Sequence, residues 1–118
     1  FVDLAGSERA KRTDHSGQRM KESVAINASL MTLGRCLESL RWNQLHPDAE
    51  PRIVPYRESK VTHLFRDVLH GWGRVLLVVN VSARAADYDE TVHVLKYAAL
   101  AATISTAAHA GAREAFKN

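Results

Sequence analysis

The first half of the chain carries a stripe of apolar residues at intervals of four and three, and this stripe limits the fold more than any other feature. Its members are Ile26, Leu30, Leu33, Leu37 and Leu40. Because residues three or four positions apart share one face of an α-helix, the pattern predicts an amphipathic helix from about residue 20 to about residue 43. At 1.5 Å per residue, that helix would be on the order of 35 Å long, which is enough to cross a domain. Gly34 lies inside it at a cost of about 1 kcal/mol relative to alanine, so we expect it to permit close contact with a neighbouring backbone.

Two shorter helices are predicted in the second half. Three prolines place residues 44–58 in a loop. A helix should follow from about residue 59 to residue 70, with Gly71 as its C-terminal cap. The last helix is expected over residues 88–104, opened by Asp87 and Glu90 as a capping box. The buried faces of the two helices are expected to be Val61, Leu64, Phe65, Val68 and Leu69 in the first and Val92, Leu95, Ala99 and Ala102 in the second.

A continuous apolar run lies between these two helices. Residues 75–79 read Val-Leu-Leu-Val-Val and are rich in β-branched side chains. Unbroken rather than alternating hydrophobicity is typical of a strand that is buried on both faces. The run therefore predicts a strand over residues 74–81 in the middle of a helix-covered sheet.

The composition excludes several classes of protein. The chain has 118 residues, a net charge of +3 and one cysteine. A single cysteine excludes a disulfide framework and fits a reducing compartment. No apolar run is long enough to span a bilayer, and no signal peptide is visible. We therefore expect a soluble, intracellular chain, although its mild positive charge does not distinguish an acidic protein partner from a nucleic acid.

The first nine residues combine an apolar start with acidic residues and a glycine. Such a stretch is typical of a buried strand whose carboxyl end delivers polar groups to a ligand crevice. Asp3 can hold a divalent cation, directly or through water. Gly6 has no side chain, so its backbone N–H can approach an anionic oxygen. The pattern suggests a magnesium-nucleotide switch, but a D-x-x-G pattern by itself is weak and is more typical of a strand that runs into an ordinary turn.

The longer motif string resembles the kinesin motor domain over residues 1–104. The stretches that carry the resemblance are Asp3–Glu8 (DLAGSE), Ile26–Leu30 (INASL), Thr32–Gly34 (TLG), Val54–Lys60 (VPYRESK) and Tyr88–Thr91 (YDET). Within that family, residues 34–36 and 89–96 are most similar to the mitotic-kinesin-like branch that acts in cytokinesis. The resemblance implies an α/β fold, the three-layer α/β/α P-loop NTPase fold of kinesin motors. We expect only its C-terminal part here: switch II, the relay helix, the microtubule-facing helix, a central strand and the last helix. Residues 105–118 remain an unassigned tail or neck-linker region.

The resemblance implies roles in ATP hydrolysis for three opening residues, with ATP and Mg2+ as cofactors. Asp3 would hold Mg2+ through water, the Gly6 N–H would donate to the γ-phosphate, and Glu8 would pair with an arginine of switch I. The chain has no G-x-x-x-x-G-K-[ST] phosphate loop, and the switch I partner is also missing. We therefore expect that the 118 residues of this chain alone do not hydrolyse ATP. Ala25 stands where kinesins usually carry asparagine, which puts normal nucleotide coupling in doubt.

The resemblance also implies a microtubule as the partner. Tubulin presents an acidic surface, and clustered cations steer and hold acidic partners. The residues that match microtubule contacts are Arg12, Arg57 and Lys60, with Lys11 and Tyr56 as neighbours. The rest of the same motor domain is the other expected partner. Neither a membrane nor a nucleic acid is expected to bind. The expected location is the cytoplasm, on cytoskeletal microtubules and the mitotic spindle.

Other interpretations remain open. The charged residues also fit a solvated face, the usual place for lysine and arginine. In function, the alternative is a non-catalytic microtubule-binding module that lacks the phosphate loop. A third possibility is half of another GTPase or ATPase, although the motif of residues 54–60 argues against it.

Overall fold

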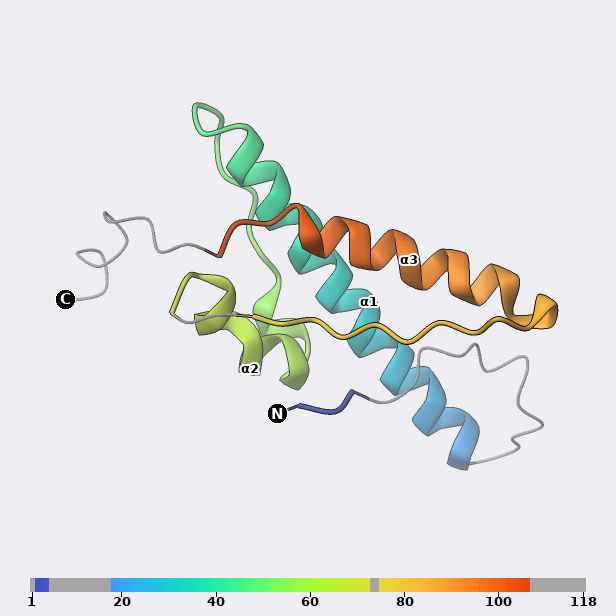
Figure 1. Cartoon of the computed structure of the whole chain (residues 1–118). Coiled ribbons are helices and arrows are strands. Elements are labelled where there is room, and N and C mark those ends of the chain that lie inside the picture. The colour runs from blue at the N-terminus through green and yellow to red at the C-terminus, as the bar shows by residue number, and fades with distance from the viewer. Residues whose placement is uncertain (1, 5–17, 73–74, 107–118) are drawn as a thin grey trace.

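A computed structural model describes residues 2–4, 18–72 and 75–106 of the chain. In chain order the elements are helix α1 (Gln18–Leu45), the 3-10 turn η2 (Tyr56–Glu58), helix α2 (Lys60–Leu69), the 3-10 turn η3 (Ala85–Asp87) and helix α3 (Tyr88–Ala102). Figure 1 shows α1 crossing the molecule, with α2 on one side of it and α3 on the other. The three predicted helices are therefore present, and their bounds lie within about two residues of the expected ones at each end.

The apolar stripe of α1 forms the core in its second half. Leu33, Leu37 and Leu40 are buried, as is Cys36 on the same side of the helix, which is 0% exposed. Buried Tyr56 from η2 and Leu69 from α2 complete the cluster. Burying one leucine side chain contributes roughly 1.5–3 kcal/mol, so this short segment of α1 supplies much of what holds the helices together.

Gly34 lies where α1 meets α3. A Cβ atom at this position would lie 3.4 Å from Cε2 of the Tyr97 ring. The predicted close contact is therefore present, but the neighbour is an aromatic side chain and not a backbone. Tyr97 is partly buried against the core cluster, and the absence of a side chain at Gly34 leaves room for its ring close to α1.

Helix α2 has well-formed ends. The Ser59 hydroxyl accepts a hydrogen bond from the Val61 N–H at 3.1 Å, which caps the start. At the other end Gly71 has a φ of 96°, and the Trp72 N–H donates to the Asp67 carbonyl, a Schellman arrangement. The predicted glycine cap is confirmed. The predicted buried face is wrong at Leu64, which is 62% exposed because that side of α2 has no described neighbour.

The loop between α1 and η2 follows a fixed path. The Asn43 side chain donates to the Arg52 carbonyl at 2.9 Å and accepts from the Arg52 N–H at 2.7 Å. The Arg52 guanidinium lies 4.3 Å from the centre of the Trp42 ring, a cation–π distance. That ring stacks on His46 at 4.6 Å. The loop predicted from its prolines is therefore held against the end of α1.

The strand predicted over residues 74–81 is not formed in the described part of the chain. Residues 75–84 run in an extended path beside α3 (Figure 1), and no strand occurs in the ranges that the structure describes. Leu76 is 87% exposed, not buried on both faces. A strand needs hydrogen-bonded neighbours, and none of the described segments supplies one. The three-layer sheet is accordingly absent from these residues.

Helix α3 differs from the prediction in its cap and in its buried face. Asp87 is the N-cap residue, but it makes no side-chain capping bond to the helix. Its carboxylate instead accepts from the Ser82 hydroxyl at 2.8 Å, so the predicted capping box is wrong. The residues that pack against the core are Tyr97, Leu100, Ala101 and, just beyond the helix, Ile104. Of the residues predicted to be buried, Leu95, Ala99 and Ala102 are exposed, because they face away from α1.

Substitutions at position 34 test this packing. We predict that Gly34→Ala raises the unfolding free energy of the protein by up to about 1 kcal/mol, because alanine favours the helix and its Cβ would make an ordinary contact with the Tyr97 ring. Gly34→Val should lower it, because a larger side chain must push the ring away. Urea denaturation of the two variants measures the difference. Equal destabilisation by both would contradict the observed contact with Tyr97.

Candidate functional site

The opening acidic residue lies at the edge of the helical core. Leu4 packs against the core cluster and so anchors this stretch of chain. The Asp3 side chain beside it is exposed. The other candidate residues of the first segment are Gly6, Glu8, Lys11 and Arg12, and they lie outside the described residues. The structure therefore describes Asp3 by itself and leaves its grouping with the others as a prediction.

The turn from η2 into α2 holds the second group of candidate residues. Arg57 and Lys60 are exposed, and neither makes an ion pair with any residue that the structure describes. Tyr56, which was expected beside them at the surface, is only 7% exposed. Its ring belongs to the core, so the expectation of a surface contact is corrected to a residue that anchors the turn.

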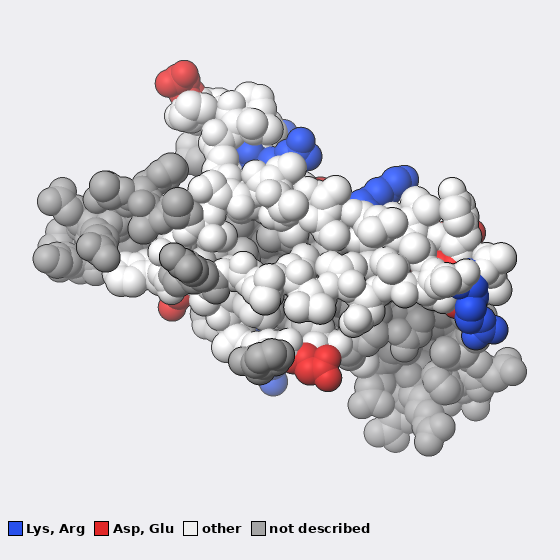
Figure 2. Space-filling view, in the orientation of Figure 1, with Lys and Arg blue, Asp and Glu red and all other residues white. Residues whose placement is uncertain are grey.

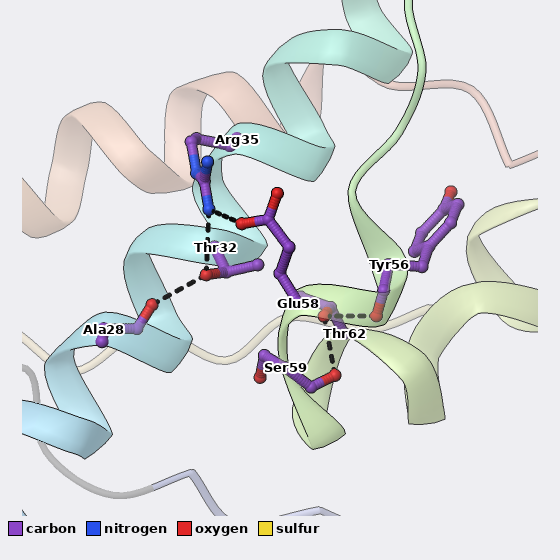
Figure 3. A network of polar contacts seen from close by, with 7 residues as sticks. All are labelled: Ala28, Thr32, Arg35, Tyr56, Glu58, Ser59 and Thr62. Atoms are coloured by element: carbon purple, nitrogen blue, oxygen red, sulfur yellow. Dashed lines mark hydrogen bonds and ion pairs between the residues drawn. The ribbon is translucent and has the colours of Figure 1, made fainter.

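A buried threonine holds the turn in shape. Thr62 is 0% exposed, and its hydroxyl lies 2.8 Å from the Tyr56 carbonyl and 2.9 Å from the Ser59 carbonyl. Figure 3 shows these contacts between the start of α2 and the turn before it. The sequence does not predict the role of Thr62, since one threonine among the apolar residues of a helix gives no signal of its own. These contacts give the backbone that carries Arg57 and Lys60 a single defined path.

The core beneath the turn carries no charge at neutral pH. Burial raises the pKa of Tyr56 to about 12 and that of the Cys36 thiol to about 11. The Tyr56 ring lies 5.2 Å from the ring of His70. Burial also lowers the pKa of His70 below its usual 6.5. All three groups are therefore neutral at pH 7, and the charge of this region comes from its surface residues.

One ion pair connects α1 to the turn. Arg35 on α1 donates through Nη2 to the Glu58 carboxylate, which lies between Arg57 and Lys60 in the sequence. The same nitrogen lies 3.4 Å from the Thr32 hydroxyl oxygen, and that hydroxyl in turn donates to the Ala28 carbonyl at 3.0 Å. Figure 3 shows the guanidinium between Thr32 and Glu58. In the sequence, Arg35 stands out only as a member of residues 34–36, the stretch that resembles the cytokinesis branch of the kinesins. Its contact with Glu58 could not be predicted, because a contact across 23 positions leaves no local pattern.

A second polar contact connects the other end of α1 to the chain beyond α3. The Gln44 side chain donates to the Ser105 carbonyl at 2.8 Å and accepts from the Ser105 N–H at 3.0 Å. These two residues are 61 positions apart. The side-chain amide thus pairs with a backbone as a neighbouring strand would, and it fixes where the chain passes after α3.

One face of the molecule is almost free of charge. Figure 2 shows this face over α3 and the extended segment before it, with the lysine, arginine and acidic side chains gathered at its rim. Exposed apolar side chains on these elements include Leu76, Val78 and Leu95. Such a surface is typical of one that another layer of protein covers.

Neither a metal cluster nor a membrane-spanning helix is found in the part of the chain that the structure describes. No group of three or more histidine, cysteine or acidic side chains lies close enough there to bind a metal ion. None of the described helices combines the length and hydropathy needed to cross a bilayer.

Comparison with known proteins identifies the family. Residues 1–104 match the family model described as Kinesin motor domain. Kinesin-like protein KIF23 of Mus musculus is 45% identical over 107 residues, which cover 91% of this chain and 11% of that protein. Kinesin-like protein KIF20A of Homo sapiens is 48% identical over 104 residues, covering 88% of this chain and 12% of that protein. The chain therefore spans only about a tenth of the length of these relatives.

A solved structure agrees with this match. It is the KIF14 dimer in its two-heads-bound state, with AMP-PNP and in complex with a microtubule. The TM-score is 0.77 at 41% sequence identity, and the alignment covers 86% of this chain and 27% of the KIF14 chain. The family predicted from the sequence motifs is thus confirmed, and the described helices have the arrangement of the corresponding part of that motor. The chain belongs to the kinesin motor-domain family.

Proposed function

We propose that this chain forms the C-terminal part of a motor domain, and that the protein containing it moves on microtubules with energy from ATP. The observation that supports this most directly is the similarity to KIF14, whose structure includes a microtubule and AMP-PNP, at a TM-score of 0.77 and 41% identity. The small share of the relatives' length that the chain spans fits a part of a larger protein. The protein would then act in the cytoplasm, on the microtubule cytoskeleton.

The proposed microtubule-binding surface is the turn formed by η2 and the first residue of α2, residues 56–60. Arg57 and Lys60 are exposed there on a backbone held by the buried residues Tyr56 and Thr62. Exposed cations on a fixed backbone, with no ion pair to any described residue, suit an acidic partner such as tubulin. Lys11 and Arg12 would extend this surface from the segment before α1.

The proposed nucleotide-sensing residues are Asp3, Gly6 and Glu8. The exposed Asp3 carboxylate can accept hydrogen bonds from water around Mg2+, and a glycine N–H three positions later can donate to a phosphate oxygen. When bound, Mg-ATP would supply the terminal phosphate whose loss is the signal. Asp3 would orient the water around the metal ion, the Gly6 N–H would donate to the terminal phosphate, and Glu8 would orient the attacking water with a partner from elsewhere in the domain.

Helix α1 would carry that signal to the microtubule surface. It begins at Gln18, shortly after the nucleotide-sensing segment, and it contacts α2, η2 and α3. A helix that touches every other helix of the described part cannot shift without changing their contacts. A switch of this kind needs two packings of similar free energy, each favoured by a different ligand state.

The uncharged face would pack against the rest of the motor domain. Segment 75–81 is extended and apolar, and the outer face of α3 beside it exposes Leu95. Strands supplied by the remainder of the domain would pair with this segment and cover both. The central strand expected from the sequence would then form only within the complete domain.

Removal of the two exposed cations tests the proposed surface. In the full-length protein, Arg57→Ala with Lys60→Ala should raise the microtubule concentration for half-maximal ATPase about fivefold, the size expected for losing roughly 1 kcal/mol of surface attraction. The salt dependence should also become weaker. Lys96→Ala is the control, because this exposed lysine lies on α3, which does not contact η2 or α2 within the described residues. An unchanged half-maximal concentration in the double variant would refute the proposed surface.

Gly6→Ala tests the nucleotide-sensing role. The added methyl group should keep the backbone N–H away from the terminal phosphate, so microtubule affinity should no longer differ between a non-hydrolysable ATP analogue and ADP. Co-sedimentation with microtubules in each nucleotide measures this difference. A normal difference between the two nucleotides would contradict the role of Gly6. A protein that binds microtubules but never hydrolyses ATP, even without substitution, would instead favour the non-catalytic binding module.

A further inference from the structure

We propose that Arg35 is a positioning residue for the Glu58 carboxylate, which lies between the proposed microtubule-binding residues Arg57 and Lys60. By pairing with the Glu58 carboxylate, it removes an uncompensated negative charge from between Arg57 and Lys60. This inference rests on the proposed function, since it concerns the same surface, but it assigns a role to a residue of α1 that need not touch the partner itself.

The geometry holds the guanidinium toward the turn. Arg35 lies one helical turn after Thr32, and its Nη2 donates to the Glu58 carboxylate and lies 3.4 Å from the Thr32 hydroxyl oxygen. Thr32 is 6% exposed, and its hydroxyl is oriented because it donates to the Ala28 carbonyl. Figure 3 shows that the arginine comes from α1 and the glutamate from the turn before α2. The pair therefore joins the proposed relay helix directly to the proposed binding surface.

The charge pattern of the turn explains what the pair does. Glu58 stands beside Arg57 and two positions before Lys60, and it is the only acidic residue of residues 54–60. An unpaired carboxylate at this point would repel an acidic partner and would compete with it for the two neighbouring cations. Paired with Arg35, the carboxylate is neutralised, and both cations remain available to the partner.

The turn does not depend on this ion pair for its shape. Thr62 bonds the Tyr56 and Ser59 carbonyls, and the Ser59 hydroxyl caps α2. The Tyr56 ring is buried in the core. By contrast, the side chains of Arg35 and Glu58 are 55% and 51% exposed, so their pairing contributes little to folding. Loss of Arg35 should therefore change the charge of the surface and leave its backbone in place.

Four variants of the full-length protein test the proposal by the direction in which each changes the affinity for microtubules. With the nucleotide state fixed by a non-hydrolysable ATP analogue, Arg35→Ala should raise the Kd for microtubules about two- to fivefold, the range for an ion pair of this exposure. Arg35→Lys, which keeps the charge, should remain close to the native value. Glu58→Gln should bind as tightly as the native protein or more tightly. The double variant Arg35→Ala, Glu58→Gln should recover the affinity lost in Arg35→Ala, because no carboxylate is left to neutralise.

Co-sedimentation at low and high salt measures these affinities, with Arg41→Ala as an exposed control on the same helix. The loss in Arg35→Ala should shrink at high salt. An unchanged Kd in Arg35→Ala would overturn the proposal. A double variant as weak as Arg35→Ala would also overturn it, because Arg35 would then contact the partner directly or support the fold. Recovery in the double variant supports the proposal even if the melting temperature of Arg35→Ala falls.

Failure of this inference is distinguishable from failure of the proposed function. If the Arg57→Ala, Lys60→Ala variant binds normally, the turn is not the binding surface and both ideas are wrong. If that variant binds weakly while Arg35→Ala binds normally, the surface is correct and only the role of Arg35 is wrong.

Discussion

The packing of one short stretch of α1 against its neighbours is the interaction on which the described structure depends. Leu33, Leu37 and Leu40 lie in a single cluster with Cys36, and residues from η2, α2 and α3 close around them. Because the cluster draws on both sides of α1, the helix cannot move without disturbing the elements on either side. A long helix in this central position is well placed to connect distant parts of a motor domain.

The polar contacts of α1 lie at the edges of this core and have a different role from the leucines. Arg35 reaches the turn before α2, and Gln44 holds the chain that follows α3. Both contacts are exposed, and an exposed ion pair such as that of Arg35 contributes little free energy by itself. They link α1 to two neighbouring segments, whereas the apolar cluster holds the helices together.

Charge and apolar surface are separated on the molecule in a way that fits part of a larger domain. The face over α3 and segment 75–81 is nearly free of charge, whereas Arg57 and Lys60 project from the turn between η2 and α2. Buried Tyr56 beneath that turn and exposed His70 beside it are both neutral at pH 7, because desolvation shifts their pKa values away from that pH. One surface is thus suited to an apolar layer of protein and the other to an acidic partner.

The sequence by itself determined the local features and the family. The leucine periodicity predicted α1, Gly71 marked the end of α2, and the motif string identified the kinesin family, because each of these signals is complete within a few neighbouring residues. Tertiary structure decided which side of α3 is buried, why Tyr56 is a core residue, and that Arg35 meets Glu58 across 23 positions. Periodicity describes one helix but not its neighbours, and a strand such as residues 75–81 cannot form without partners that lie elsewhere. The candidate site was therefore predictable in its residue types, whereas its arrangement depended on contacts between residues far apart in the chain.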